Sequence, residues 1–201
     1  MIGRAVAGLA RLLAGGYVRW DAPPSTNGAR VFFANHTSHL DFVLLWSYLP
    51  PAVRRRTRPV AARDYWEKGP VRRYLASQVF RALLIERSGP QARTAVERMA
   101  DGLAAGDSLI LFPEGTRGAG LEIAPFKAGL YHLCVARPGL ELVPVSIENL
   151  NRVLPKGEFL PVPMVSRVIF GDSLRLGEGE EKEAFLARAR LAVQTLREDA
   201  R

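Results

Sequence analysis

Several things that this sequence lacks limit what the protein does. Cys134 is the only cysteine among 201 residues, which excludes a disulfide framework and a cysteine metal cluster and indicates a reducing compartment. No run of apolar residues approaches the roughly 18 that a membrane-spanning helix needs. No Gly-x-Ser-x-Gly motif occurs, which argues against a serine hydrolase built on that turn.

What is present is a globular composition with an uneven charge. Hydrophobic residues make up 48% of the chain and charged residues 24%, which suits one folded domain with its own core. Residues 1–85 carry 13 of the 28 Lys and Arg but only 4 of the 20 Asp and Glu. This basic half indicates a polyanionic partner, such as an anionic membrane, a phosphorylated substrate or nucleic acid, or else a solvated arginine-rich surface.

Residues 1–20 are predicted to form an amphipathic helix. Its apolar side chains share one arc at about 100° per residue, and they are Ile2, Val6, Leu9, Leu13, Tyr17 and Trp20. Arg4 and Arg11 point away from that arc. Such a helix either packs its stripe on the protein's own core or lies on a membrane, with Trp20 as an interfacial anchor.

The rest of the chain alternates strands and helices. Strands are predicted at residues 30–34, 58–62, 82–86, 108–112, 142–147 and 165–170. Helices are predicted at 41–49, within 65–80, from a Ser88 cap to Gly106, at 126–135 and at 180–199. The pattern predicts one α/β domain over 1–201, with a mixed, mostly parallel sheet flanked by helices. Its parts are the N-terminal helix over 1–20, a core over 30–175 and a C-terminal helix over 180–199.

The first candidate site follows the first core strand, in the segment Asn35-His36-Thr37-Ser38-His39-Leu40-Asp41. Histidine is the usual base for a hydroxyl near neutral pH, and a carboxylate on its far ring nitrogen fixes the tautomer. Five positions apart on one ideal helix, the two side chains would point away from each other. The pairing therefore requires His36 in the turn and Asp41 in the first turn of the helix.

Two alternatives for this segment remain open. Ser38 and Asp41 have the spacing of a capping box, in which the carboxylate only closes the start of the helix. A metal site from His36, His39 and Asp41 is the other, although zinc sites usually take three or four ligands. His132 is the remaining histidine, and its apolar neighbours in sequence place it in the core.

The second candidate site is Phe112-Pro113-Glu114-Gly115-Thr116-Arg117, which follows another hydrophobic strand. Backbone amides freed by a glycine turn, beside a guanidinium, suit a phosphate group. The alternative is a tight turn with solvated charges. Both segments follow strands, and ligands of open α/β sheets favour the carboxyl ends of strands.

Four segments in order resemble the four-block signature of the glycerolipid acyltransferase family, whose typical member is 1-acylglycerol-3-phosphate acyltransferase. They are His36 to Asp41, Arg87 after a hydrophobic strand, residues 112–117, and Val143-Pro144-Val145-Ser146. Residues 125–129 are similar to a further element of that family, and the resemblance covers about residues 30–147. One departure is Arg81, where many relatives have glycine.

The resemblance implies an O-acyltransferase that moves a fatty acyl group from a thioester to a lysophospholipid-like acceptor. It implies no cofactor and no metal, with acyl-CoA or acyl carrier protein as co-substrate. His36 is expected to be the base and Asp41 its orienting carboxylate. The residues expected to bind substrates are Arg87, Glu114, Gly115, Thr116, Arg117, Lys127 and Pro144.

Individual roles follow from the same resemblance. Arg87 and Arg117 are expected at the phosphate of the acceptor, and Glu114 and Gly115 are expected to shape its site. Lys127 is expected at an anionic group, and Pro144 on the side of the acyl donor.

The same resemblance implies a peripheral enzyme on the cytoplasmic face of a membrane, in contact with its lipids. The N-terminal helix and Arg54-Arg55-Arg56 are expected to hold it there. The alternatives are another lysolipid or glycolipid acceptor, and a non-catalytic domain that binds lipid or nucleic acid. No nucleic-acid partner is expected for the enzyme.

Overall fold

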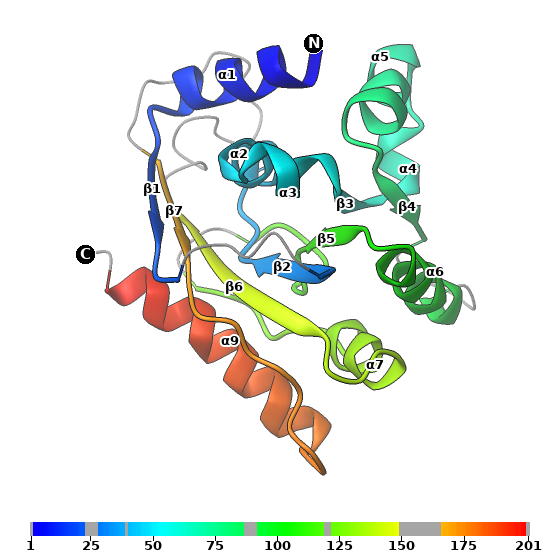
Figure 1. Ribbon diagram of the computed structural model, residues 1–201, viewed down its shortest axis with the longest axis vertical. Coiled ribbons are helices and arrows are strands. Elements are labelled where there is room, and N and C mark those ends of the chain that lie inside the picture. Colours follow the sequence, from blue (N-terminus) through cyan, green and yellow to red (C-terminus); the bar gives the residue numbers. More distant parts are fainter. Residues whose placement is uncertain are drawn as a thin grey trace.

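A mixed sheet of seven strands forms the centre of the protein (Figure 1). The computed structural model describes residues 2–22, 28–38, 40–86, 92–118, 122–148 and 166–199. The strands are β1 (Tyr17–Trp20), β2 (Arg30–Ala34), β3 (Thr57–Ala62), β4 (Leu83–Ile85), β5 (Ser108–Leu111), β6 (Glu141–Glu148) and β7 (Arg167–Phe170). The helices are α1 (Ile2–Ala14), α2 (Asp41–Tyr48), α3 (Pro51–Arg55), α4 (Arg63–Trp66), α5 (Pro70–Tyr74), the π-helix η1 (Leu75–Val79), α6 (Ala92–Ala104), α7 (Gly129–Ala136) and α9 (Lys182–Glu198).

The strand order β1-β7-β6-β2-β5-β3-β4 places β2 in the interior of the sheet. Strands β6, β2, β5, β3 and β4 run parallel, whereas β7 runs antiparallel to β6 and β1 runs parallel to β7. The predicted mixed, mostly parallel sheet is therefore confirmed. Because β2, β5, β3 and β4 share one direction, the segments that follow them meet at one edge of the sheet.

Strand β2 is buried on both faces because its side chains alternate between two cores. Phe32 and Ala34 join the cluster that α1 and α2 cover, and Val31 and Phe33 join the cluster under α6, α7 and α9. Figure 1 shows these helices on opposite faces of the sheet. A continuous apolar run of this kind is typical of an interior parallel strand, so β2 is a rigid base for the residues after it.

The predicted N-terminal helix ends six residues early. Gly15 takes a positive φ of +53°, which stops α1 after Ala14, and the chain then continues as β1. Gly16 passes so close to α2 that a Cβ there would collide with the Tyr48 hydroxyl. Two consecutive glycines thus outweigh the apolar periodicity that predicted helix as far as residue 20.

Trp20 belongs to β1 and not to a membrane-facing stripe. Its ring stacks on Phe170 of β7, with centroids 3.6 Å apart and planes 2° from parallel. The expectation that Trp20 is an interfacial anchor is therefore wrong. Outward-facing side chains of α1 remain exposed instead, with Ile2 52%, Leu9 56% and Leu12 79% accessible to solvent.

Arg81 follows the π-helix and has a φ of +51°, the one positive φ on a non-glycine residue among those described. A Cβ disfavours this left-handed conformation, whereas glycine adopts it freely. The glycine that the family resemblance leads us to expect at this position therefore has a backbone explanation. Helix α6 begins at Ala92, and the predicted Ser88 cap lies outside the described residues.

Candidate active site

His36 lies just beyond the carboxyl end of β2 and faces the first residue of α2. Its Nδ1 atom is 2.9 Å from Oδ2 of Asp41; the Asp41 side chain is wholly buried, and 21% of the His36 side chain is exposed. A carboxylate at Nδ1 favours the tautomer with the proton on that nitrogen, which leaves a lone pair on Nε2. The predicted contact is present, with the geometry of a base oriented by a carboxylate.

Asp41 also holds the turn that leads into α2. Its Oδ2 accepts the backbone N–H groups of Thr37 at 2.6 Å and Ser38 at 2.8 Å. The Ser38 hydroxyl accepts from the N–H of Leu40 at 3.3 Å, so only the carboxylate half of the capping box forms. One carboxylate therefore both orients the imidazole and caps the turn, and the two interpretations of this segment are compatible.

The ring of Phe112 supports the imidazole from the neighbouring strand. Phe112 follows β5, and its ring stacks on His36 with centroids 4.3 Å apart and an angle of 22° between the planes. Together with the Asp41 contact, this stacking restricts both the tilt and the rotation of the His36 ring. Sequence reasoning assigned no role to Phe112, although the side chain opens the second motif.

Asn35 joins β2 to β6 next to the histidine. Its amide donates to the Ile147 carbonyl at 2.8 Å and accepts from the Ile147 N–H at 2.8 Å, and the side chain is buried. Pro144 is buried within β6 and pairs in register with Phe33. The fourth motif, residues 143–146, thus supports the sheet behind His36 and does not line an open surface.

Glu114 contacts the His36 backbone directly. Its Oε1 accepts the His36 N–H at 2.7 Å, and its Oε2 accepts the Ala124 N–H at 2.9 Å. The side chain is only 4% exposed. The His36 carbonyl in turn accepts from the N–H of Gly118 at 2.8 Å. Both backbone polar groups of His36 are thus bound to the segment that contains the second motif.

The other predicted residues of this motif surround an open turn. Gly115 has a φ of +73°, and a Cβ there would lie 2.7 Å from Nζ of Lys127, so glycine suits both the turn and the close approach of the lysine. The side chains of Thr116, Arg117 and Lys127 are exposed. The structure therefore brings these cationic and hydroxyl groups to the same sheet edge as His36.

The remaining predicted site residues are not all placed. Arg87 and His39 lie outside the described residues. Among the residues that are described, no group of three or more His, Cys, Asp and Glu side chains is arranged to hold a metal ion. His132, expected in the core, is exposed on α7 because its side chain lies on the outer side of that helix.

A family match covers the segment that builds this site. Residues 20–148 match the family model described as Acyltransferase. The chain belongs to the acyltransferase family. It is similar to the 1-acyl-sn-glycerol-3-phosphate acyltransferase of Limnanthes alba, with 26% identity over 179 residues that cover 84% of this chain and 59% of the relative. It is likewise similar to the Escherichia coli (strain K12) protein of the same name, with 28% identity over 140 residues that cover 63% and 52%.

The fold of this acyltransferase also has a counterpart among solved structures. The crystal structure of the 1-acyl-sn-glycerophosphate (LPA) acyltransferase PlsC from Thermotoga maritima superposes with a TM-score of 0.76. It is 19% identical, and the match covers 98% of this chain and 78% of that one. Identity at this level shows a shared fold. The chain spans between half and three-fifths of the length of the two curated relatives.

Proposed function

We propose that this acyltransferase transfers a fatty acyl group from a thioester to the hydroxyl of a lysophospholipid-like acceptor, with 1-acylglycerol-3-phosphate as the expected acceptor. The observation that carries the proposal is the contact between His36 and Asp41 beside a turn with an exposed arginine. The names of the curated relatives support this acceptor.

The chemistry needs one proton carrier. Nε2 of His36 accepts the proton of the acceptor hydroxyl as the oxygen attacks the thioester carbonyl. The tetrahedral intermediate collapses, the carbon–sulfur bond breaks, and the imidazolium returns the proton to the leaving thiolate. Asp41 stabilises the imidazolium between these two transfers. The products are an ester and a free thiol.

Arg117, Thr116 and Lys127 are proposed to bind the phosphate of the acceptor. A phosphate takes several charge-assisted hydrogen bonds, and a guanidinium offers two of them in a fixed geometry. The phosphate of this acceptor lies only a few bonds from the reacting hydroxyl, so its binding groups must lie near His36. The Gly115 turn, joined to His36 through the neighbouring Glu114, meets that requirement.

Glu114 is proposed to position the base. Both of its carboxylate oxygens already accept backbone N–H groups, and the side chain is buried. Such a group offers little to a substrate but holds His36 and the segment around Ala124 at a fixed separation. This role differs from the acceptor contact that the family resemblance implies.

We further propose peripheral attachment to the cytoplasmic face of an anionic membrane through α1. Among the described residues, no helix is long and apolar enough to cross a membrane. The exposed Ile2, Leu9 and Leu12 form an apolar strip on α1. Such a strip suits the boundary between head groups and acyl chains.

Cationic groups accompany this strip. Arg11 of α1 and Arg54 of α3 both donate to the Ser47 carbonyl near the end of α2. Burial, followed by the charges of Arg11, Arg4 and Arg55, lowers the pKa of Arg54 from its ordinary value. These guanidinium groups are thus gathered from two separate segments, and they supply the attraction that anionic lipid requires.

The non-catalytic alternative has weaker support. Single-stranded nucleic acid is bound on exposed aromatic rings. Trp46 is 5% exposed beneath the Arg54 guanidinium, and Arg11 lies over Tyr48. Another lysolipid or glycolipid acceptor is compatible with the same base and remains the alternative within enzymes.

The deciding experiment measures the thiol released from long-chain acyl-CoA, or from acyl carrier protein loaded with a long-chain acyl group, with and without 1-acylglycerol-3-phosphate. Wild type should release thiol only when acceptor is present, and His36→Ala should lower turnover by about 10²- to 10⁴-fold. Cys134 is buried, and burial raises the pKa of its thiol to about 12, so it adds little background with a thiol reagent. Acceptor-independent release would identify a thioesterase, and near-normal turnover by His36→Ala would remove His36 as the base.

A further inference from the structure

Helix α5 carries an exposed apolar face. All eight residues from Glu67 to Tyr74 are exposed. Val71 is 70% exposed and Tyr74 is 48% exposed, and residues three apart on a helix lie on the same side. Single exposed apolar side chains are ordinary on a protein surface, so the surroundings of this pair must identify its partner.

Cationic side chains surround the apolar pair. Lys68 lies just before α5, and Arg72 and Arg73 lie within it. The one carboxylate of residues 67–74 is Glu67, which is paired with Arg63 at 2.7 Å. Apolar side chains with cations around them suit anionic lipid, because the apolar groups enter the boundary of the acyl chains while the cations contact the head groups.

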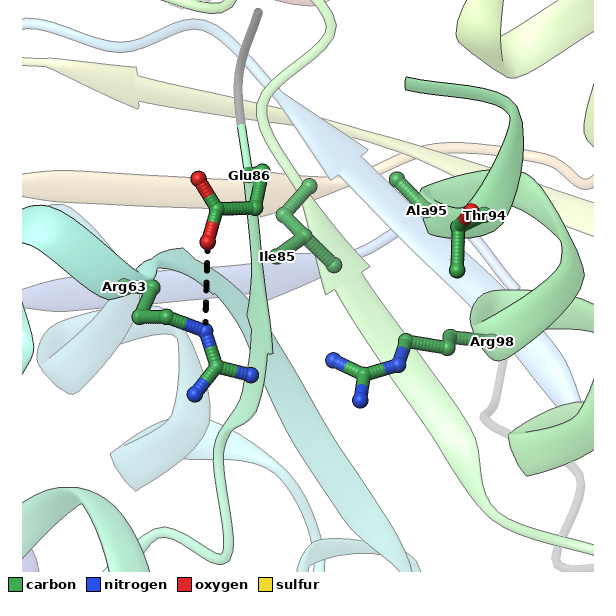
Figure 2. A pocket seen from close by; sticks show the side chains of 6 residues that line it. All are labelled: Arg63, Ile85, Glu86, Thr94, Ala95 and Arg98. Carbon is green, nitrogen blue, oxygen red and sulfur yellow. Dashed lines mark ion pairs between the residues drawn. The ribbon is translucent and has the colours of Figure 1, made fainter. Parts of the chain in front are cut away.

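The segment that carries α5 is fixed to the sheet at both ends. Arg63, the first residue of α4, directly follows β3 and pairs at 3.6 Å with Glu86, which directly follows β4 (Figure 2). After α5, Leu75 and Val79 of η1 pack against the hydrophobic cluster that α1 and α2 cover. The exposed face of α5 therefore belongs to a supported part of the fold.

Helix α5 lies on the same side of the protein as α1. Val6 and Ala7 of α1 pack in the same hydrophobic cluster as η1, so both segments cover one face of the sheet. Figure 1 shows α1 and α5 at one end of the molecule and α9 at the other. Two apolar projections at one end are able to rest together on a flat surface, which is what a bilayer offers.

We propose that α5 is a second lipid contact, which holds the carboxyl edge of the sheet against an anionic bilayer. The inference rests on the proposed attachment to an anionic membrane and adds the orientation of the site on it. Attachment through one helix leaves the protein free to tilt, whereas two separated contacts fix which edge faces the lipid.

A short chain of rings joins α5 to the catalytic turn. The Arg72 guanidinium lies over the Tyr65 ring at 4.4 Å, and Tyr65 contacts Trp66 with centroids 5.6 Å apart. Trp66 contacts Phe42 with centroids 5.4 Å apart, and Phe42 directly follows Asp41. An acceptor in the bilayer beside α5 therefore has a short path to the catalytic pair.

Binding to vesicles of phosphatidylglycerol and phosphatidylcholine in equal amounts, measured by co-sedimentation, tests the contact. We expect Val71→Asp to weaken binding about tenfold, because it replaces an apolar contact with a charge that anionic lipid repels. Val135→Asp is the matched control and should bind like wild type, because Val135 is 53% exposed on α7, on the other face of the sheet. Lys68→Gln should weaken binding about 3- to 5-fold with these vesicles and leave binding to phosphatidylcholine alone unchanged.

The double variant Leu12→Asp/Val71→Asp separates α5 from α1. Two contacts on one bilayer act together, so their losses should multiply to about a hundredfold. Equal binding by the double variant and Leu12→Asp, or equal weakening by Val71→Asp and Val135→Asp, would overturn the proposal. An effect of Val71→Asp without one of Leu12→Asp would support α5 and contradict attachment through α1. None of these outcomes needs catalysis, so they test the contact even if wild type transfers no acyl group.

Turnover tests the orientation. With acceptor in vesicles at limiting lipid, Val71→Asp should lower the rate about tenfold, and with a water-soluble short-chain donor and acceptor it should match wild type. An equal loss with both kinds of substrate would overturn the proposal, because α5 would then act on the catalytic turn itself. A loss confined to acyl carrier protein as donor, with vesicle binding intact, would assign the face to a protein partner and overturn the lipid contact.

Discussion

Glu114 and His36 are joined through the backbone, although 78 residues separate them in the sequence: Oε1 of Glu114 accepts the His36 N–H at 2.7 Å. The other oxygen of the same carboxylate accepts from Ala124 at 2.9 Å. A carboxylate presents acceptors on both sides and no donor, and both neighbours here are donors. The position therefore requires a side chain with two acceptor oxygens, and a side chain of similar size is not sufficient.

Glu114→Gln tests this requirement. The amide of glutamine turns its NH₂ group toward one of the two N–H donors, so a buried hydrogen bond to a charged group is lost. We expect the free energy of unfolding to fall by about 1.5–3 kcal/mol. We also expect kcat to drop at least about tenfold while the acceptor KM stays within about twofold.

The matched control is Glu122→Gln, since Glu122 is exposed and should tolerate the change. Urea unfolding and steady-state kinetics on the two variants provide the comparison. A raised acceptor KM with normal kcat and stability would instead make Glu114 a substrate ligand.

Arg117→Ala tests the proposed phosphate contact. With 1-acylglycerol-3-phosphate, we expect the acceptor KM to rise about tenfold or more, because a charge-assisted contact is worth about 1.5–3 kcal/mol. The donor KM should change little. A monoacylglycerol acceptor, which lacks the phosphate, serves as control and should react equally with both proteins. Equal kinetics with the phosphorylated acceptor would remove Arg117 from this role.

Arg81→Gly tests the backbone explanation for the departure at that position. Glycine relieves the positive φ of +51°, and the change removes the 3.3 Å bond of Arg81 to the Arg55 carbonyl and its loose 3.7 Å ion pair with Asp107. We expect the free energy of unfolding to rise by about 0.5–1 kcal/mol. Arg73→Gly, within α5, should lower it by about as much. If chemical denaturation showed that both changes lower the free energy of unfolding equally, the contacts of Arg81 would outweigh the relief of its positive φ.

Cys134 should make the stability depend on pH at the alkaline end. Burial raises the pKa of this thiol from 9.0 to about 12, and the charge of Glu180 adds to the effect. The folded protein therefore holds the proton at pH values where the unfolded chain loses it, so stability is complete below pH 9 and falls as the pH rises toward 12. The expected loss is about 1.4 kcal/mol between pH 8 and pH 10.

Comparison with Cys134→Ala isolates this loss from the titration of other groups. The difference in unfolding free energy between the two proteins should change with pH only above about pH 8. In the folded wild type, the thiol should also resist a thiol reagent until denaturant is added. Rapid labelling of the native protein would show that the thiol is accessible.

Leu12→Asp tests membrane attachment through α1. Leu12 is 79% exposed, so the change should leave the fold intact while removing an apolar group from the proposed lipid contact. Binding to anionic phospholipid vesicles should weaken about tenfold or more. Leu191→Asp is the control, because Leu191 is 59% exposed on α9, which covers the other face of the sheet from α1 (Figure 1). Equal effects of the two changes, measured by co-sedimentation, would argue against α1 as the contact.

The local sequence pattern was sufficient to predict the strand in the interior of the sheet. The apolar run at residues 30–34 predicted β2 at its observed bounds, because a strand buried on both faces needs only apolar side chains. The pairing of His36 with Asp41 was also predictable, because both residues lie in one turn of seven residues. The prediction was wrong for residues 15–20, where the chain leaves the helix to add an edge strand to the sheet.

The amino-acid sequence alone was enough to predict the α/β class and the contact between His36 and Asp41, because both depend on neighbours within a few residues. The tertiary structure was needed to place the Phe112 ring behind the imidazole and the Glu114 carboxylate on the His36 backbone. These contacts join residues from different strands. Strand order, which no local pattern encodes, decides which of them become neighbours.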